Sequence, residues 1–354
     1  MMLKNIFKSD ILFFSRSTLR NNKQLLDFHY FVAEEVLHGS SVIVIWYGGW
    51  VYRILQKLRL DGMCLRTMKL IFRPKLALFM DESSSRKLAP QVKKLLAVKT
   101  ANLSHALVSY HKFYRDIDFD YYFVYGNKCR FSCERFNIKL NHTRLVPIGP
   151  FYSACKMLMK GNSFRDSLEV ALSRNNEYSV RICITSQWLD LNASKSLLFD
   201  SYCKLLEYIE LNSDILFYIK PHPLERDTNS PLSRAYSLNN AIALSKESSI
   251  SDLSDVVDLN VCSFSNSVID FAMLGVPSLF LRFRSEVLDN YGVVPNDYSL
   301  VVDDMKAFDY IVRNRRFSKA DAQKIIDHNT DGRGFDSILN FQKQINKIIN
   351  ESQF

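Results

Sequence analysis

The first 150 residues alternate between short apolar runs and longer amphipathic stretches. The apolar runs have the length of buried strands; they are residues 41–45, 76–80, 120–124 and 145–148. Helical periodicity fills residues 51–59 and 90–99 between them. Strands that alternate with helices favour a parallel α/β sheet. The most apolar stretch, residues 41–51, is interpreted as a buried strand with its turn.

The same pattern starts again at residue 180. Five further runs have strand length; they are residues 180–185, 215–219, 241–244, 259–262 and 278–282. Helical patterns cover residues 195–211, 267–274 and 320–350, and residues 249–254 suit a short helix or loop. A polar stretch at 160–178, with a helical piece at 164–173, separates the two halves and is typical of a linker between domains.

A chain of 354 residues fits two domains better than one. We therefore predict an α/β protein with two Rossmann-like domains, residues 1–160 and 178–330, followed by a C-terminal helix in residues 331–354. Neither half contains a GxGxxG or a GxxxxGK[ST] loop. Their absence argues against a nicotinamide-dependent dehydrogenase and against a P-loop nucleotidase.

The positive charge is concentrated in the first domain. The net charge is +9, and residues 1–100 hold 17 Lys or Arg against 7 Asp or Glu, a difference of +10. Such a basic face suits an anionic substrate or an anionic membrane, unless it is simply a solvated surface. No helix-turn-helix, zinc or RNA-binding signature accompanies the charge, so nucleic acid is not the expected partner.

Several features favour a reducing, cytoplasmic location. The start, residues 1–20, mixes charged residues into its apolar ones, so it does not resemble a secretory signal. No run approaches the ~18–20 apolar residues that span a bilayer. The seven cysteines form no CxxC pair, and we expect reduced, mostly buried thiols. Cys129 and Cys133 lack a second pair or a nearby His, and the histidines show no metal spacing, so no metal site is predicted.

The segment Lys220-Pro221-His222-Pro223 follows an apolar strand directly. In open α/β sheets, ligands bind at the carboxyl ends of the strands. The two prolines restrict the backbone on both sides of the imidazole. A rigid imidazole beside a lysine suits an anionic group such as a leaving phosphate. The alternative is a turn that uses proline and exposes its His.

A second candidate lies between a later strand and a helix. Residues 263–271 place Ser265, Asn266 and Ser267 at the start of the helix, with Asp270 one turn in. A helix N-terminus offers free N–H groups and a partial positive charge, so these residues suit a phosphate. Ser and Asn are also common helix caps, which is the alternative. Asp270 would face a ribose hydroxyl or favour the helix dipole.

The third candidate is the acidic pair Asp81 and Glu82, which follows the apolar strand at 76–80. A carboxylate at a strand end can act as general base on an acceptor hydroxyl. A solvated, acidic start to the next helix is the alternative. Ser186 and Gly149, each directly after a predicted strand, are additional candidate site residues.

These motifs, taken in order, resemble those of the bacterial sialyltransferases and polysialyltransferases. Those families share a D/E-D/E-G motif, an HP motif and a later Ser/Thr pair, matched here by Asp81-Glu82-Ser83, Lys220-Pro221-His222-Pro223 and Ser265-Asn266-Ser267. Here Ser83 replaces the motif Gly and Asn266 replaces its second Ser. Residues 262–277 also resemble the CDP-glycerol glycerophosphotransferases, and capsule-polysaccharide transferases carry similar KPHP segments.

The resemblance implies a GT-B fold, in which two Rossmann-like domains face a cleft, and a reaction that needs no metal or cofactor. It implies that Asp81, with Glu82 as the less favoured choice, deprotonates the acceptor. It implies that His222 assists departure of the phosphate. The nucleotide phosphate would be held by Ser265, Asn266 and Ser267, together with the neighbouring Lys220 and Pro223.

The function expected from the sequence is transfer of a sugar, such as a sialic acid, from a CMP-linked donor to a glycan or lipid-linked glycan of a bacterial surface polysaccharide, such as lipopolysaccharide O-antigen or capsule. The enzyme would work in the cytoplasm or at the inner face of the inner membrane. Three alternatives remain: a CDP-glycerol or ribitol-type polyol-phosphate transferase, a sugar-nucleotide epimerase, and a non-catalytic GT-B subunit.

Overall fold

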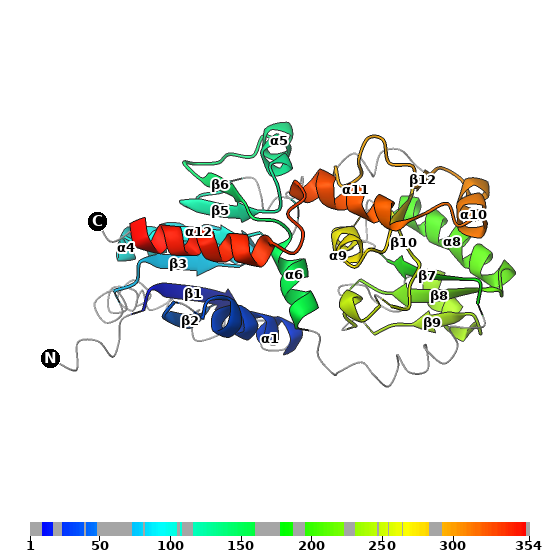
Figure 1. The fold of residues 1–354 in the computed structure, drawn as a ribbon, viewed down its shortest axis with the longest axis horizontal. Coiled ribbons are helices and arrows are strands. Elements are labelled where there is room, and N and C mark those ends of the chain that lie inside the picture. Colours follow the sequence, from blue (N-terminus) through cyan, green and yellow to red (C-terminus); the bar gives the residue numbers. More distant parts are fainter. Residues whose placement is uncertain are drawn as a thin grey trace. The chain divides into compact units, whose positions relative to one another are not determined.

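Two six-stranded sheets, each entirely parallel, organise the chain in this computed structural model (Figure 1). The structure describes residues 9–16, 23–38, 40–47, 73–80, 82–104, 107, 116–159, 178–186, 195–222, 231–245, 248–253, 255–263, 265–282 and 292–351. Contacts divide the chain into two compact units: residues 1–159 with 330–354, and residues 160–329. The predicted α/β class with two Rossmann-like domains is confirmed.

The sheet of the first unit has the strand order β2-β1-β3-β4-β5-β6. Its strands are β1 (Ile11–Arg16), β2 (Val42–Tyr47), β3 (Leu76–Phe79), β4 (Lys99–Leu103), β5 (Tyr121–Val124) and β6 (Arg144–Pro147). Its helices are α1 (Lys23–Phe31), the π-helix η3 (Val32–Val36), α4 (Glu82–Leu96), α5 (Lys128–Arg135), α6 (Phe151–Leu158) and α12 (Ser337–Glu351).

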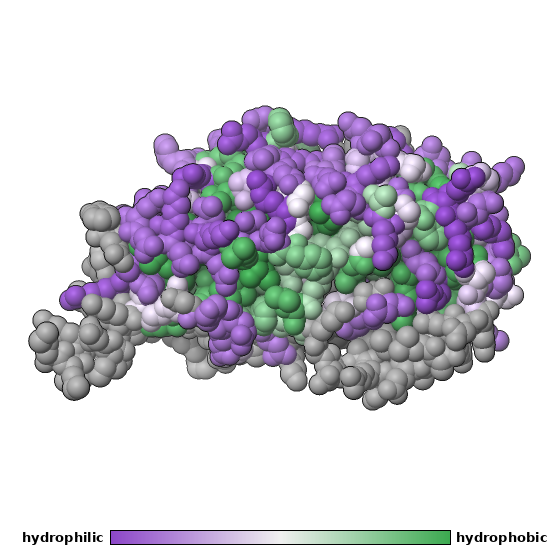
Figure 2. Space-filling model, in the orientation of Figure 1, coloured by the Kyte–Doolittle hydropathy of each residue, from purple (hydrophilic) through white to green (hydrophobic). Residues whose placement is uncertain are grey.

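Helices cover both faces of this sheet. Alternate residues of a strand point to opposite faces, so Ile11 and Phe13 pack with α1, α6 and α12. Leu12 and Phe14 pack on the other face with α4 and α5. Figure 1 shows α12 lying across the strands, and its outer side is mostly hydrophilic in Figure 2. The C-terminal helix therefore completes the core of the first unit.

The sheet of the second unit has the strand order β12-β11-β10-β7-β8-β9. Its strands are β7 (Val180–Thr185), β8 (Ile215–Lys220), β9 (Ala241–Ala243), β10 (Leu259–Cys262), β11 (Ser278–Leu281) and β12 (Val301–Val302). Its helices are α8 (Lys195–Leu211), the 3-10 helices η6 (Pro231–Ser237) and η7 (Ile250–Leu253), α9 (Ser267–Met273), α10 (Met305–Arg313) and α11 (Lys319–Thr330), whose last residue belongs to the first unit.

This sheet is also covered on both faces. The ring of Tyr208 in α8 contacts Phe217 of β8 and Phe308 of α10 on one side. On the other side, Tyr218 and Cys183 pack with Phe271 of α9. All six residues of β8 are buried, as expected for a central parallel strand.

Several sequence predictions need correction. The helix expected at 90–99 ends at Leu96, and Lys99 already begins strand β4. The strand at 42–47 lies at the edge of its sheet, so Val42, Ile43 and Ile45 are only partly buried. The single helical stretch expected at 320–350 is two helices, because Asp331 and Gly332 adopt positive φ angles between α11 and α12. The sequence interpretation also missed β1, β12, α1, α5, α6 and α10.

The remaining sequence predictions concern two further helices, the cysteines and membrane-spanning segments. The helical patterns at 51–59 and 164–173 lie outside the described residues, as does Cys64. Five of the other six cysteines are buried free thiols, and Cys203 is partly exposed. Across the described part of the chain, no helix is both long and apolar enough to cross a membrane.

Gly149 occupies a position where a side chain does not fit. Its φ is +99°, and a Cβ there would lie 2.9 Å from Cβ of Ser337 and 3.0 Å from the carbonyl oxygen of Arg333. The close approach lets the segment before α12 lie against the end of β6. This packing accounts for the glycine without a ligand, and its predicted place in the binding site remains a prediction.

Replacing Gly149 with Ala should destabilise the first unit by about 2 kcal/mol or more, because the strained φ and the steric contacts add. The expected fall in its thermal midpoint is roughly 4–8 °C. Gly334→Ala is the matched control, since a Cβ at Gly334 meets no atom within 4 Å. Equal midpoints for the two variants in calorimetry would contradict this account of Gly149.

Candidate functional site

The strand order of the second unit defines where a ligand should bind. The chain enters this sheet at β7, adds β8 and β9 on one side, and then adds β10, β11 and β12 on the other. The carboxyl ends of β7 and β10 therefore flank the point where the strand order reverses, which is the usual ligand site of such sheets. Ser186 follows β7, and Ser263 follows β10.

The segment after β8 is fastened to the segment after β7. The N–H of Ser186 donates to the carbonyl oxygen of Lys220 at 3.0 Å. The N–H of His222 donates to Oγ of Ser186 at 3.0 Å. Ser186 thus fixes the backbone on both sides of Pro221. The predicted rigidity around His222 has this hydrogen-bonded basis, while Pro223 lies outside the described residues.

Lys220 is a buried lysine at the last position of β8. Its side chain is 8% exposed, and Nζ lies 3.5 Å from the carbonyl oxygen of Pro221. Its register partner on β7 is Thr185, so both side chains stand on the same face of the sheet. That face is the one covered by α9. The side chain therefore stands on the face of the sheet that α9 covers, and its positive charge lies close to the segment that carries His222.

The imidazole of His222 is half-buried. Burial, and secondarily the charge of Lys220, lower the pKa of His222 below its ordinary value. The free imidazole is therefore mostly neutral at pH 7 and carries one N–H. An anion bound beside it would favour the protonated form. His222 can thus donate a hydrogen bond to a phosphate in either state.

Hydroxyl groups gather where α9 begins. Oγ of Ser265 accepts the N–H of Ser267 at 3.1 Å and the hydroxyl of Ser267 at 2.7 Å. The Ser267 hydroxyl also lies 3.5 Å from Oγ1 of Thr185. A hydroxyl oxygen has two acceptor positions, and both of those on Ser265 are used. The single proton of Ser265 is therefore left to donate to another group.

Ser263 adds a buried hydroxyl. The residue is 4% exposed, and its Oγ makes no hydrogen bond with any residue that the structure describes. An unsatisfied buried hydroxyl costs about 1–3 kcal/mol. Ser263 lies at the end of β10, beside the point where the strand order reverses. An oxygen atom of a bound ligand could accept the proton of this hydroxyl and so satisfy it.

The remaining candidate residues of this unit are Asn266 and Asp270, both in or next to the first turn of α9. Asn266 is the N-cap of α9, with helical φ and ψ of −66° and −19°, and its side chain makes no capping hydrogen bond. Asp270 lies in the first turn of α9 and is partly buried. The structure thus brings Lys220, Ser186, Ser265 and Ser267 to one edge of the sheet, with His222 bonded to Ser186.

The sequence interpretation missed Thr185. The available signal was its position as the last residue of a mostly apolar strand, directly before the loop at the carboxyl end. Its hydroxyl lies beside Ser267 and also donates to Oδ1 of Asn260 at 3.1 Å. Asn260 carried no signal that separates it from any other polar residue in a strand.

The acidic candidates belong to the first unit. Asp81 lies outside the described residues. Glu82 is the first residue of α4, and the structure describes its backbone but not its side chain. In the first sheet, β1 is the first strand, β2 lies on one side of it and β3 on the other. The end of β3, at buried Met80, therefore flanks the point of reversal in this sheet, and Asp81 follows Met80 in the chain.

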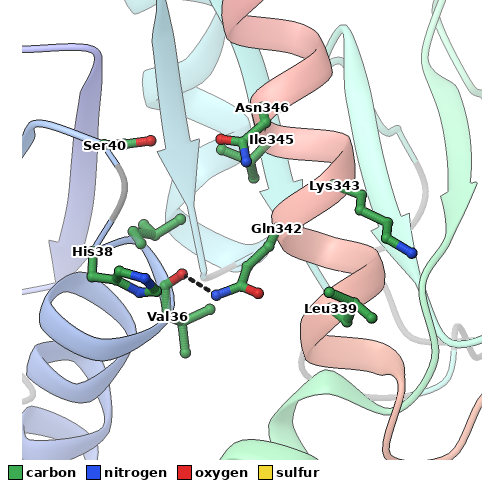
Figure 3. A pocket seen from close by; sticks show the side chains of 9 residues that line it. Val36, His38, Ser40, Leu339, Gln342, Lys343, Ile345 and Asn346 are labelled. Atoms are coloured by element: carbon green, nitrogen blue, oxygen red, sulfur yellow. Dashed lines mark hydrogen bonds between the residues drawn. The ribbon is translucent and has the colours of Figure 1, made fainter.

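A pocket of about 230 Å³ lies elsewhere in the first unit (Figure 3). It is lined by Val36, Leu37, His38, Ser40, Leu339, Gln342, Lys343, Ile345 and Asn346. Nε2 of Gln342 donates to the carbonyl oxygen of Val36 at 2.8 Å across it. Ser40 precedes strand β2, so the pocket opens near the amino end of that strand. It contains none of the predicted site residues.

Within the described ranges, no group of three or more His, Cys, Asp or Glu side chains is arranged to hold a metal ion. This observation does not test the prediction of a metal-independent reaction, because that prediction concerns the transfer chemistry.

The groups gathered at the carboxyl edge of the second sheet are a lysine, an imidazole and hydroxyls. Such groups suit an anion.

No protein-family model and no curated protein matches this sequence. Solved structures do match its fold. The wall teichoic acid polymerase TagF, in a structure soaked with CDPG, is 13% identical over 99% of this chain and 91% of its own, with a TM-score of 0.56. A glycosyltransferase from Rickettsia africae is 9% identical over 98% and 99%, with a TM-score of 0.57.

UDP-GlcNAc 2-epimerase from Neisseria meningitidis, bound to UDP-GlcNAc, is 12% identical over 95% of this chain and 99% of its own, with a TM-score of 0.58. Identities this low establish the fold and nothing finer. The two parallel six-stranded sheets and these similarities agree with each other. The fold of this chain is the GT-B fold.

Proposed function

We propose that this protein is a glycosyltransferase that binds the phosphate of a nucleotide-linked donor in its second unit. The observation that carries the proposal is the Ser265 hydroxyl: Ser267 fills both of its acceptor positions, which leaves its proton to donate to another group. A phosphate oxygen is the acceptor such a group would meet. Lys220, His222 and the buried Ser263 hydroxyl add one charge and two further donors at the same strand ends.

The chemistry follows from the side chains. Asp81 accepts the proton of the acceptor hydroxyl as its oxygen bonds to the anomeric carbon of the sugar. The bond between that carbon and the phosphate oxygen breaks, and the nucleotide leaves with the bonding electrons. Lys220, His222 and Ser265 stabilise the negative charge that develops on the leaving phosphate. The reaction needs no metal in this scheme.

The donor we propose is a CMP-linked sugar of the sialic acid kind, and the acceptor is a glycan of a bacterial surface polysaccharide. The basic first hundred residues suit an anionic acceptor or the inner face of the membrane, where lipid-linked glycans are built. The cytoplasm is the proposed location. This assignment rests on the sequence resemblance, with the GT-B fold as its structural support.

One observation favours a second candidate. TagF is a wall teichoic acid polymerase whose structure was soaked with CDPG, and residues 264–272 match the Ser and Asp-Phe-Ala pattern of glycerophosphotransferases. Transfer of a polyol phosphate from a CDP-linked donor would use the same anion site. An assay for phosphorus in the polymer product separates it from sugar transfer. An epimerase would instead isomerise the donor without any acceptor.

Nucleotides should raise the thermal stability of the second unit. A ligand at 100 times its Kd adds about 2.7 kcal/mol to the stability of the form that binds it. In a thermal-shift panel of CMP, CDP, UDP and GDP, we expect the cytidine nucleotides to raise the midpoint by several degrees. Ser265→Ala should reduce that shift, whereas Ser237→Ala, at an exposed serine of η6, should preserve it. If no nucleotide changes the midpoint, the proposed function is wrong.

A further inference from the structure

A buried hydrogen-bond chain crosses the sheet of the second unit and ends at the proposed phosphate site. Nδ2 of Asn260 donates to Oγ of Ser278 at 2.9 Å. Oδ1 of Asn260 accepts the hydroxyl of Thr185 at 3.1 Å. Asn260 is 0% exposed, Ser278 1% and Thr185 4%. The chain therefore joins three neighbouring strands, β11, β10 and β7, in the interior of the unit.

The direction of these bonds restricts what Thr185 can do. Asn260 presents its carbonyl oxygen to Thr185, because its amino group is bonded to Ser278. Thr185 has one hydroxyl proton, and it is used toward Asn260. Its oxygen can therefore meet Ser267 only as an acceptor. The single proton of Ser267 is directed mainly to Ser265 at 2.7 Å, and Thr185 lies 3.5 Å from the Ser267 oxygen as a second, longer acceptor. Thr185 does not supply a donor to a ligand; it holds the first turn of α9 against the sheet.

A polar chain in this place needs a reason. Cys183 and Tyr218, whose side chains stand on the same face, belong to an apolar cluster with α9. Buried polar groups in such surroundings must be fully bonded, and apolar residues there would be simpler to pack. The chain begins at fully buried Asn260 and leads to Ser267 and Ser265. Ser267 donates its proton to Ser265, and Ser265 is the hydroxyl proposed to donate to the ligand.

We propose that Asn260 and Thr185 are positioning residues of this anion site, which set the place and the donor direction of the Ser267 and Ser265 hydroxyls for the phosphate of the donor. This inference rests on the proposed function and deepens it. Removing the Asn260 carbonyl frees the Thr185 proton, which can then be donated to the oxygen of Ser267. The Ser267 hydroxyl would turn to accept it, and the bond by which Ser267 orients the Ser265 hydroxyl would weaken.

The test is calorimetric titration of CMP and CDP into the full chain. Thr185→Val and Asn260→Leu should each weaken binding roughly three- to tenfold, as expected for one misplaced hydrogen bond. Thr185→Ser keeps the hydroxyl and should bind within about twofold of wild type. Because Asn260 acts through Thr185, the double variant should bind no more weakly than Thr185→Val alone.

A matched control is available in the first unit. Asn102 is also 0% exposed in a strand, and neither its amide oxygen nor its amide nitrogen bonds to a described residue. Asn102→Leu should therefore leave nucleotide affinity unchanged while removing a buried strand amide. Should Asn260→Leu fail to fold, the Val and Ser variants of Thr185 still decide the question.

The outcomes separate the two proposals. If wild type binds neither CMP nor CDP, the nucleotide site itself is wrong, and this inference falls with it. If wild type binds but Thr185→Val and Asn260→Leu bind equally well, only the positioning role is wrong. Additive losses in the double variant would also overturn it, since they would mean that the two residues act independently.

Discussion

Replacing His222 with Ala should lower the transfer rate by about 100-fold or more while the second unit stays folded. The imidazole is half-buried near Lys220, and it can donate a hydrogen bond to a departing phosphate. Removing one preorganised donor to developing charge costs roughly 10²–10³ in rate. The measurement is the initial rate of transfer from the CMP-linked donor to the glycan.

The design of the His222 variant isolates the side chain. The bond between the His222 backbone N–H and Ser186 survives the change, so the segment stays fastened. His38→Ala is the matched control, because His38 is an exposed histidine of the first unit, bonded to the carbonyl oxygen of Glu35. That control should keep the wild-type rate. A His222→Ala enzyme with full activity would remove this residue from the mechanism.

Replacing Asp81 with Asn should lower the rate of transfer by roughly 10²–10⁴-fold, which is the typical contribution of a general base. Donor binding should not change, because the groups that hold the phosphate belong to the second unit. The rate is followed with saturating donor and acceptor, and nucleotide affinity is measured separately by titration. A loss of rate at constant affinity is the signature of a group that acts on the acceptor.

Glu82→Gln provides the comparison for Asp81. The resemblance favours Asp81 as the base, so the Glu82 variant should lose much less activity. The reverse order, with Glu82→Gln inactive and Asp81→Asn active, would move the role of base by one residue. If both variants transfer at the wild-type rate, the acidic pair has no catalytic role and serves only as the start of α4.

Much of the second unit could be predicted from the sequence. Strand β7, helix α8 and strand β10 have the predicted bounds, because each strand is mostly apolar and the helix has a long periodic pattern. The pattern failed at β4, which contains Thr100 and Asn102. Both side chains are fully buried, and Thr100 bonds to Asp120 across the sheet. Because these polar side chains interrupt the apolar pattern, local hydrophobicity did not predict a strand here. The sheet nevertheless buries both of them.

The sequence predicted which strand ends form the candidate site, but it did not predict the hydrogen bonds between them. Lys220, His222 and Ser265 follow apolar strands, and parallel strands bring their carboxyl ends to one edge. The hydrogen bonds that make the site specific join residues far apart in the chain, as with Ser186 to His222 and Thr185 to Asn260. Such pairings depend on strand order, and the sequence pattern does not encode strand order locally.

The central claim is that the phosphate of a nucleotide binds at the carboxyl ends of β7, β8 and β10. The most direct measurement is a crystal structure of the protein with CMP or CDP bound. The account predicts phosphate oxygens within hydrogen-bond distance of the Ser265 hydroxyl, with Lys220 and His222 beside them. Nucleotide bound in another place, such as the pocket between Val36 and Leu339, with the Ser265 hydroxyl left unbonded, would contradict it.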